Sequence, residues 1–208
     1  MINAFIVDIT KCDFDYNLLY ASLSESGKLK IDKYIKHEDK VRSLIGQILI
    51  NRFTPIDEQI TYSENGKPYK KSILFNLSHS KDMVVLVTSK THEVGVDVEY
   101  IEDEIKDGID SFSFGEKLSP IEFYSKWTRR EAIGKCTGKG IFTNFKEIPS
   151  SLGLNKYGNR NIYVETEIVG KYALSIAYES TNKLDIKMQN IDRLWGELWK
   201  LQANYLSY

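Results

Sequence analysis

The sequence predicts an α+β protein made of two halves, each with one long helix and a few mostly antiparallel strands. Short runs of β-branched and aromatic residues, separated by polar turns, predict the strands. Two stretches, one with apolar residues at helical spacing and one with clear start and stop signals, predict the helices. An acidic connector near residues 100–118 lies between them, so we divide the chain into residues 1–105 and 106–208.

The first half begins with a β-branched and aromatic run, Ile2–Ile9, that predicts a strand. His37–Arg52 places its apolar side chains on one stripe, which predicts an amphipathic helix that ends near Pro55. Asn65–Pro68 has the composition of a turn. Three short strands then follow, most simply as a meander: Ile73–Leu77, Met83–Thr88 and Val94–Glu99.

The second half follows a polar connector, Asp103–Ser119, which we expect to be a loop or weakly helical. Ser119–Glu122 matches a capping box with proline at the first helical position, and Gly138 fits a C-cap, so a helix is expected over Pro120–Thr137. The remaining elements are a strand pair joined across Gly170-Lys171 and a final helix whose apolar stripe suits a core or dimer contact: Ile162–Val169, Tyr172–Tyr178 and Ile191–Tyr205.

The composition is that of a globular protein. The 208 residues are 42% hydrophobic and 27% charged, which argues against a disordered, collagen-like or coiled-coil chain. A net charge of −1 excludes a nucleic-acid binder that relies on bulk positive charge. Cys12 and Cys136 give neither a disulfide framework nor metal-ligand spacing. Without a basic leader or a run of ~20 apolar residues, the sequence predicts a soluble, cytoplasmic protein with no membrane partner.

The charges are grouped in three blocks along the chain. Residues 28–42 are mainly basic, residues 97–110 mainly acidic, and residues 126–139 basic again. Each block alone is typical of a solvated surface. Together, basic blocks on both sides of an acidic one also suit a polyanion that is held through a cation.

Two carboxylates stand close together at the end of the strand that contains Gly95-Val96-Asp97-Val98-Glu99. Because side chains at i and i+2 share a face, Asp97 and Glu99 project together while the valines face the core. Two charges a few ångströms apart repel by roughly 4 kcal/mol at an effective dielectric constant near 20. Solvent, a proton or a cation must offset that repulsion, and oxygen ligands suit magnesium rather than zinc.

A second group of candidates lies on the helix of the second half. Trp127, Glu131 and Lys135 stand at positions i, i+4 and i+8 and therefore share one face. A Glu-Lys pair at this spacing is ordinarily a surface pair worth a few tenths of a kcal/mol. Its place between a tryptophan and the turn Gly138-Lys139-Gly140 makes a functional role a second interpretation.

An adjacent serine and histidine, Ser78 and His79, follow a predicted strand. Their side chains cannot meet across one peptide in the geometry of a catalytic triad. A turn that carries a hydroxyl, an imidazole and free backbone N–H groups can instead hold a phosphate. Lys67 beside Pro68, and Arg42 on the first helix, offer further cations for anionic oxygens.

Five short motifs follow one another on the expected secondary structure. In order they are R-S-L-I-G in the first basic block, N-G-K-P, N-L-S-H-S, G-V-D-V-E, and W-T-R-R-E-A-I-G-K followed by G-K-G. This order resembles the 4′-phosphopantetheinyl transferases of the surfactin-synthetase-activating class, over residues 28–141. The resemblance implies a monomer that is a pseudo-dimer of two similar helix-plus-antiparallel-sheet halves, with coenzyme A in the cleft between them.

The resemblance also implies a reaction, that of a holo-[carrier protein] synthase. The family transfers the phosphopantetheine arm of coenzyme A to a serine of an apo acyl or peptidyl carrier protein and releases adenosine 3′,5′-bisphosphate. On the matching positions, Asp97, Glu99 and Glu131 would hold magnesium. Glu131 would also be the base for the carrier serine, because a neutral serine is a poor nucleophile. Lys135 would stabilise the developing charge on the phosphate.

The same resemblance assigns the nucleotide end of coenzyme A to hydroxyl and cationic side chains. Ser78 and His79 match the positions that bind the 3′-phosphate. Further candidates for nucleotide binding are Arg42 and Lys67, together with Lys30 and Lys33 from a segment that aligns approximately with the family.

Three positions depart from the family pattern. Arg130 stands where the family has lysine, so that the compact charge of an ammonium group is replaced by a planar guanidinium with several donors. Residues 111–116, S-F-S-F-G-E, are a degraded form of a Phe-Phe-Ser-x-x-Glu pattern, which bears on carrier docking. Ile141 replaces a leucine, a trivial change.

Two other classes of function would use part of the same residues. A magnesium-dependent phosphohydrolase or nuclease would also use Asp97, Glu99 and Glu131, and would turn over a nucleotide-like substrate without a carrier. A non-catalytic module that binds coenzyme A or a nucleotide could dispense with Glu131 and Lys135, which are both present. A degenerate transferase acting as a scaffold would be expected to have lost a carboxylate.

Overall fold

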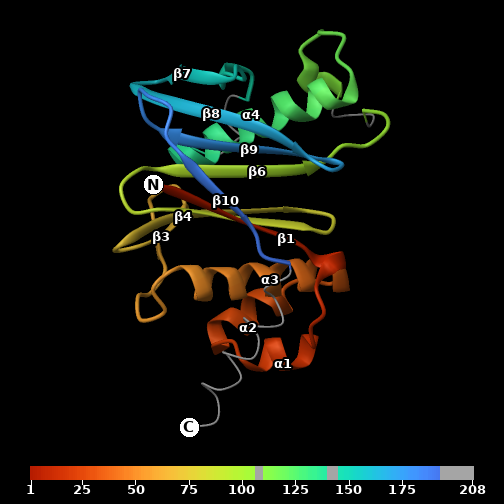
Figure 1. Ribbon diagram of the computed structural model, residues 1–208, viewed down its shortest axis with the longest axis vertical. Coiled ribbons are helices and arrows are strands. Elements are labelled where there is room, and N and C mark those ends of the chain that lie inside the picture. The colour runs from red at the N-terminus through yellow and green to blue at the C-terminus, as the bar shows by residue number, and fades with distance from the viewer. Residues whose placement is uncertain (106–109, 140–144, 193–208) are drawn as a thin grey trace.

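The computed structural model describes residues 1–105, 110–139 and 145–192 of the chain. Its elements form four layers, with two β-sheets in the middle and helices on the two outer sides (Figure 1). One apolar cluster fills the space between the sheets, and further clusters lie between each sheet and its helices. The structure is therefore an α+β arrangement, as the sequence predicts.

The first sheet has six strands in the order β10-β1-β5-β4-β3-β2. Strand β10 runs parallel to β1, and the other neighbours are antiparallel. The strands are β1 (Ile2–Asp8), β2 (Thr61–Tyr62), β3 (Pro68–Lys70), β4 (Ile73–Ser80), β5 (Met83–Ser89) and β10 (Ile186–Asn190). One face of this sheet packs against the helices α1 (Tyr16–Ala21), α2 (Glu25–Asp32) and α3 (His37–Phe53).

The second sheet has four antiparallel strands in the order β6-β9-β8-β7. They are β6 (Val94–Tyr100), β7 (Gly153–Tyr157), β8 (Arg160–Val169) and β9 (Tyr172–Glu179). The face of this sheet that turns away from the first sheet is covered by the helix α4 (Pro120–Thr137). Short 3-10 turns at Ile9–Lys11, Asp110–Ser113 and Phe145–Glu147 complete the described elements.

The elements with the clearest local signals are confirmed. Helix α4 begins with the predicted capping box at Ser119 and ends at Gly138, whose φ of 71° is the left-handed conformation that glycine adopts without strain. The first strand, the helix α3 and the hairpin across Gly170-Lys171 also lie where the sequence predicts them. The final helix expected over Ile191–Tyr205 falls almost entirely outside the described residues.

The predicted meander of three strands is wrong in its third member. Strands β4 and β5 form a hairpin, but β6 pairs with β9 in the other sheet. The reason is that a strand has only two edges, and those of β5 are taken by β4 and β1. The sequence interpretation also missed α1 and α2, although Asp15 and Ser24 cap them through hydrogen bonds to backbone N–H groups.

Each sheet takes one strand from across the predicted boundary at residues 105 and 106. Strand β6, from the first half, belongs to the second sheet, and β10, from the second half, lies at the edge of the first sheet. The two halves are thus joined by strand exchange as well as by packing. The division of the chain into two domains and their pseudo-dimer relation stay predictions.

Helix α4 and strand β6 approach each other unusually closely, and Gly95 makes this possible. A Cβ atom at Gly95 would lie 2.1 Å from the carbonyl oxygen of Ala132 and 2.3 Å from the backbone nitrogen of Cys136. No side chain fits in that space, so the backbones of β6 and α4 are in direct contact. Alternation along β6 places Asp97 and Glu99 on the same side as Gly95, facing the helix.

Candidate active site

Asp97 is the centre of a buried group of polar side chains between β4, β6 and α4. Only 3% of the residue is exposed. Its Oδ1 atom lies 2.5 Å from Lys135 Nζ and accepts a hydrogen bond from Ser78 Oγ at 2.9 Å. Lys135 Nζ also lies 3.2 Å from Ser78 Oγ, so the three side chains contact one another. The second carboxylate oxygen of Asp97, Oδ2, is buried and has no hydrogen-bond partner among the described residues.

Glu131 and Glu99 complete the acidic side of the site. Glu131 lies one turn before Lys135 on α4 and is only 8% exposed. Glu99, two residues beyond Asp97 on β6, accepts a hydrogen bond of 2.7 Å from Ser80 Oγ. The valines between these acids, Val96 and Val98, are fully buried in the core between the sheets. One carboxylate thus contacts the ammonium group of Lys135, and the other two act on it electrostatically.

The electrostatics of the site indicate a surplus of negative charge. Burial, together with the charges of Asp97 and Glu99, raises the pKa of Glu131 to about 7. Burial also raises the pKa of Asp97, although Lys135 opposes that shift. Burial acts against the charged form of Lys135, but the attraction of the surrounding carboxylates outweighs it and raises the pKa of the ammonium group. All three shifts favour the more protonated form, so the site would gain from a further cation.

Ser78 and His79 lie on opposite faces of a strand, not together in a turn. The motif N-L-S-H-S belongs to β4, and the turn comes after it, at Lys81 and Asp82. Because neighbouring side chains in a strand alternate, Ser78 points toward β6 and Asp97 while His79 faces the α3 side. The expectation of a shared phosphate-binding turn is therefore wrong in its geometry.

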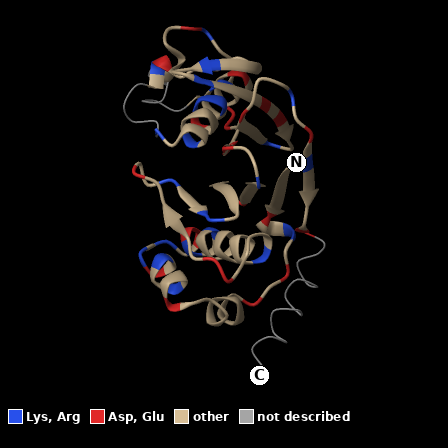
Figure 2. Ribbon diagram, turned by 90° about the vertical axis from the view of Figure 1, so that its left-hand side faces the viewer, with Lys and Arg blue, Asp and Glu red and all other residues tan. Residues whose placement is uncertain are grey.

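His79 borders a surface pocket of about 410 Å³ between α2, the middle of α3 and β4. The pocket brings together three of the side chains assigned to the nucleotide: Lys30, Lys33 and His79. Basic residues gather on α2 and at the start of α3, in the lower part of Figure 2. Partial desolvation, with the nearby charge of Arg42, lowers the pKa of His79, so the imidazole is largely neutral at pH 7.

Arg42 lies next to this pocket but is already engaged by the protein. Its guanidinium pairs with Asp39 at 2.5 Å and donates a hydrogen bond of 2.9 Å to the carbonyl oxygen of Lys81. It therefore connects α3 to the tip of the hairpin formed by β4 and β5. Its positive charge still acts on His79 across the pocket wall.

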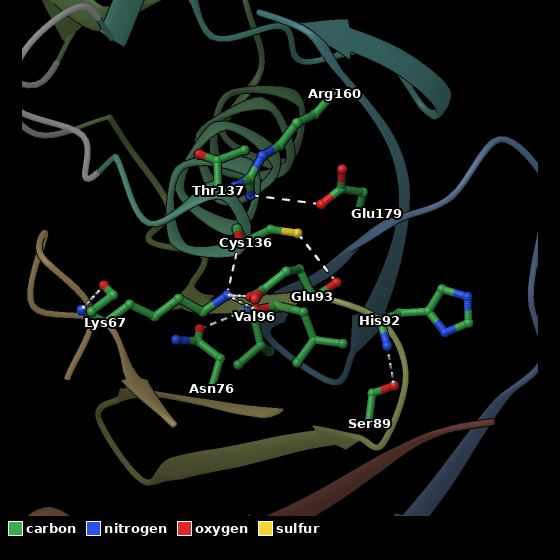
Figure 3. Close-up of polar contacts among 12 residues, drawn as sticks. Lys67, Asn76, Ser89, His92, Glu93, Val96, Cys136, Thr137, Arg160 and Glu179 are labelled. Carbon is green, nitrogen blue, oxygen red and sulfur yellow. Dashed lines mark hydrogen bonds and ion pairs between the residues drawn. The ribbon is translucent and has the colours of Figure 1, made fainter. Parts of the chain in front are cut away.

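Lys67 is not brought together with the other nucleotide candidates. Its side chain reaches from the turn before β3 to the start of β6 and the end of α4 (Figure 3). The ammonium group donates to Glu93 Oε2 at 2.5 Å and to the carbonyl oxygens of Cys136 and Val94 at 2.8 and 2.9 Å. Three donors meet three protein acceptors, which leaves none for a ligand in this arrangement.

Arg130, the departure from the family pattern on α4, faces away from the carboxylates. Its Nε atom donates to the carbonyl oxygen of Ile148 at 3.1 Å, and its guanidinium lies 5.0 Å from the ring centroid of Phe114 and 5.6 Å from that of Phe145. Phe114 belongs to the degraded motif at residues 111–116. The guanidinium thus lies over two aromatic rings, and its contacts are outside the acidic site.

Sequence reasoning missed three residues that shape the site. Asn76 and Ser80, on the same face of β4 as Ser78, bind the backbone of β6, and Gly95 permits the contact with α4. A signal was present, because small polar residues stand at every second position along Asn76–Ser80. That period of two is typical of a strand and argues against a turn.

The donor chemistry of the acidic site bears on whether it can hold a magnesium ion. Within residues 1–105, 110–139 and 145–192, no group of three His, Cys, Asp or Glu side chains is already arranged to hold a metal ion. The chemistry of the donors nevertheless fits a hard divalent cation, because they are carboxylates with surplus negative charge. The buried Oδ2 atom of Asp97 lacks a partner in the described structure. The donor atoms at this site are therefore of the type that magnesium prefers.

Comparison with known proteins identifies the family. The chain is 30% identical to the 4′-phosphopantetheinyl transferase gsp of Aneurinibacillus migulanus over 145 residues. This aligned region covers 61% of each of the two chains. It is 33% identical over 132 residues to the 4′-phosphopantetheinyl transferase AcpT of Salmonella typhi, covering 54% of this chain and 68% of the relative. A putative 4′-phosphopantetheinyl transferase of Synechocystis is 27% identical over 164 residues, 66% of this chain and 65% of the relative.

The protein belongs to the 4′-phosphopantetheinyl transferase family, a family of enzymes, and the resemblance drawn from the five motifs is confirmed at that level. No family model matches the chain. The chain spans less than two thirds of the length of gsp and of the Synechocystis relative. None of the described helices is long and apolar enough to cross a membrane.

The raised pKa of Glu131 predicts a pH-dependent effect of Glu131→Gln on stability. Between pH 4.5 and 7 the unfolded chain loses the Glu131 proton while the folded protein keeps it, so folded-state stability falls as pH rises. The variant removes this loss and should be more stable than the wild type at pH 8, by up to about 3 kcal/mol, but not at pH 4. Urea unfolding in the presence of EDTA, at pH 4 and at pH 8, measures the difference in the free energy of unfolding between the variant and the wild type.

Glu122→Gln on the same helix is the matched control. Hydrogen bonds from Ser119 lower the pKa of Glu122, so this variant should gain nothing at pH 8. An equal stability difference between Glu131→Gln and the wild type at both pH values would contradict the assignment of a buried, proton-retaining Glu131.

Proposed function

We propose that the protein transfers the 4′-phosphopantetheine arm of coenzyme A to a serine of an apo acyl or peptidyl carrier protein. The products are the holo-carrier and adenosine 3′,5′-bisphosphate. The observation that carries this proposal is the position of two sites on the two faces of β4. Ser78 contributes to the acidic site and its neighbour His79 to the basic pocket. In the described structure β3 pairs with β4 only at Ile73 and Leu74, so one ligand with two phosphate groups would reach both sites across the remaining edge of β4.

The basic pocket suits the nucleotide end of coenzyme A. Lys30 and Lys33 supply fixed positive charge for the 3′-phosphate. His79, which is largely neutral in the free protein, would take up a proton when a phosphate dianion enters. Arg42 adds positive potential at the wall of the pocket. Ser78, in contrast, supports the acidic site by holding Asp97.

The acidic site suits the chemical step. The carrier serine Oγ attacks the phosphorus that bears the pantetheine arm, and the bond from that phosphorus to the bridging pyrophosphate oxygen breaks. Glu131 takes the serine proton, and its pKa of about 7 leaves much of it in the base form at neutral pH. Lys135 remains charged and stabilises negative charge on the transferred phosphate.

Magnesium is the cofactor that we propose for this site. Asp97, Glu99 and Glu131 would hold it, and when bound it would neutralise pyrophosphate charge and stabilise the leaving oxygen. One chain supplies all of these residues, so we also propose that the monomer is active.

Transfer to a carrier is tested by the intact mass of several apo carriers after incubation with coenzyme A and magnesium. The wild type should add one phosphopantetheine group to at least one carrier. In single-turnover transfer, Glu131→Gln should be slower by at least ~10², the scale of losing a general base. Glu167→Gln, an exposed change on β8, is the control and should keep the wild-type rate.

Two results of that experiment would contradict the proposal. Carriers that gain no mass, together with hydrolysis of coenzyme A by the protein alone, would support the phosphohydrolase instead. Full activity in Glu131→Gln would remove the proposed base even if transfer itself occurs.

The opposite orientations of Ser78 and His79 predict different kinetic effects. His79→Ala should raise the KM for coenzyme A more than the KM for 3′-dephospho-coenzyme A, because only the former carries the 3′-phosphate. Ser78→Ala should lower kcat with both substrates to a similar extent, because it loosens Asp97. Steady-state kinetics with the two substrates checks this. Equal effects of His79→Ala on both KM values would show that the histidine does not bind the 3′-phosphate.

A further inference from the structure

Lys67 connects three parts of the chain through one ammonium group. It stands in the turn before β3, and its side chain, only 10% exposed, reaches β6 and α4 (Figure 3). The acceptors are Glu93 Oε2, the carbonyl oxygen of Val94 and the carbonyl oxygen of Cys136, at 2.5, 2.9 and 2.8 Å. We call these four residues the Lys67 clamp.

The clamp satisfies backbone groups that the secondary structure leaves open. Cys136 lies in the last turn of α4, where helix carbonyl groups have no partner within the helix. A lysine at this end also compensates the negative end of the helix dipole. Here that lysine comes from a distant segment, 69 residues earlier in the chain. The thiol of Cys136 adds a contact of 3.4 Å to the carbonyl oxygen of Glu93.

The two elements held by the clamp are those that carry the acidic site. Cys136 follows Lys135 directly on α4, and Val94 lies three residues before Asp97 on β6. The clamp therefore fixes the end of the helix relative to the start of the strand. The ion pair between Lys135 and Asp97, at 2.5 Å, spans the same two elements.

We propose that Lys67 is a positioning residue for the transfer reaction and not a nucleotide ligand: it holds α4 on β6 so that Lys135 and Glu131 keep their places beside Asp97. This rests on the proposed function for its kinetic consequences. The competing role, a direct grip on coenzyme A, would require the ammonium group to leave all three acceptors. Its burial and its complete set of partners favour the structural clamp.

The two roles predict opposite kinetics for Lys67→Met, which keeps the length of the side chain but removes the charge and donors. A positioning residue affects the chemical step, so kcat should fall at least about tenfold while the KM for coenzyme A stays within about twofold, since small misplacements of reacting groups cost that much. Lys71→Met, an exposed lysine just after β3, is the control and should leave both constants unchanged. A rise in KM with kcat unchanged would overturn the proposal.

A partner of the clamp gives an independent test. Glu93→Gln weakens the same contact and should lower kcat in the same direction. The double variant Lys67→Met/Glu93→Gln should lose clearly less than the product of the two single losses, because the residues act as one unit. Fully multiplicative losses would overturn the clamp. If Lys67→Met does not fold, Glu93→Gln and Lys67→Arg, which keeps the charge and donors, are compared in the same assay.

Hydrogen exchange separates failure of the clamp from failure of the proposed function, because it needs no substrate. Lys67→Met should speed exchange of the amides of residues 133–138, at the end of α4 and its C-cap, at least about tenfold. The amides of α3 should keep their wild-type rates. Unchanged exchange at residues 133–138 would overturn the clamp whether or not the protein transfers phosphopantetheine.

Discussion

The structure depends on a set of hydrogen bonds between the two sheets, in which side chains of one sheet bind the backbone of the other. Strand β6 is the edge strand of its sheet, and its outward N–H groups are buried against β4, where an unsatisfied donor would be costly. Three side chains of β4 accept from them at every second position: Asn76 from Val96 N at 2.9 Å, Ser78 from Val98 N at 3.3 Å and Ser80 from Tyr100 N at 3.1 Å. The constant spacing fixes the register of one sheet on the other.

The same hydroxyl groups couple this register to the acidic site. Ser78 donates to Asp97 and Ser80 donates to Glu99, so each serine accepts from the β6 backbone and donates to a carboxylate that projects from the same strand. Sliding β4 by one residue would lose both functions together, because its alternate side chains face the pocket side. The close contact at Gly95 then brings α4, with Glu131 and Lys135, onto this fixed strand. Packing and chemistry are therefore specified by the same residues.

The sequence predicts those parts of the molecule whose cause is local. The proline and capping box at Ser119 start α4, and Gly138 ends it, because these signals act within one turn of the helix. The residues of the acidic site also follow from motifs, since alternation places Asp97 and Glu99 on one face. Contacts over long distances in the chain are not predictable in this way. The exchange of β6 and β10 between sheets, the burial of Asp97, and the contact from Lys67 to the carbonyl oxygen of Cys136 depend on how distant segments pack, and a backbone carbonyl carries no sequence signal.

We propose that this buried site receives a divalent cation, and calorimetric titration of Mg²⁺ into protein saturated with coenzyme A measures that binding. The titration is made at pH 7 in two buffers of different ionisation enthalpy, with coenzyme A alone as the reference. Because Glu131 retains a proton near pH 7, cation binding should release a fraction of a proton per ion. One ion should bind per chain, with proton release, and Asp97→Asn should lose this binding. Saturation without proton release, or equal binding by Asp97→Asn, would contradict it.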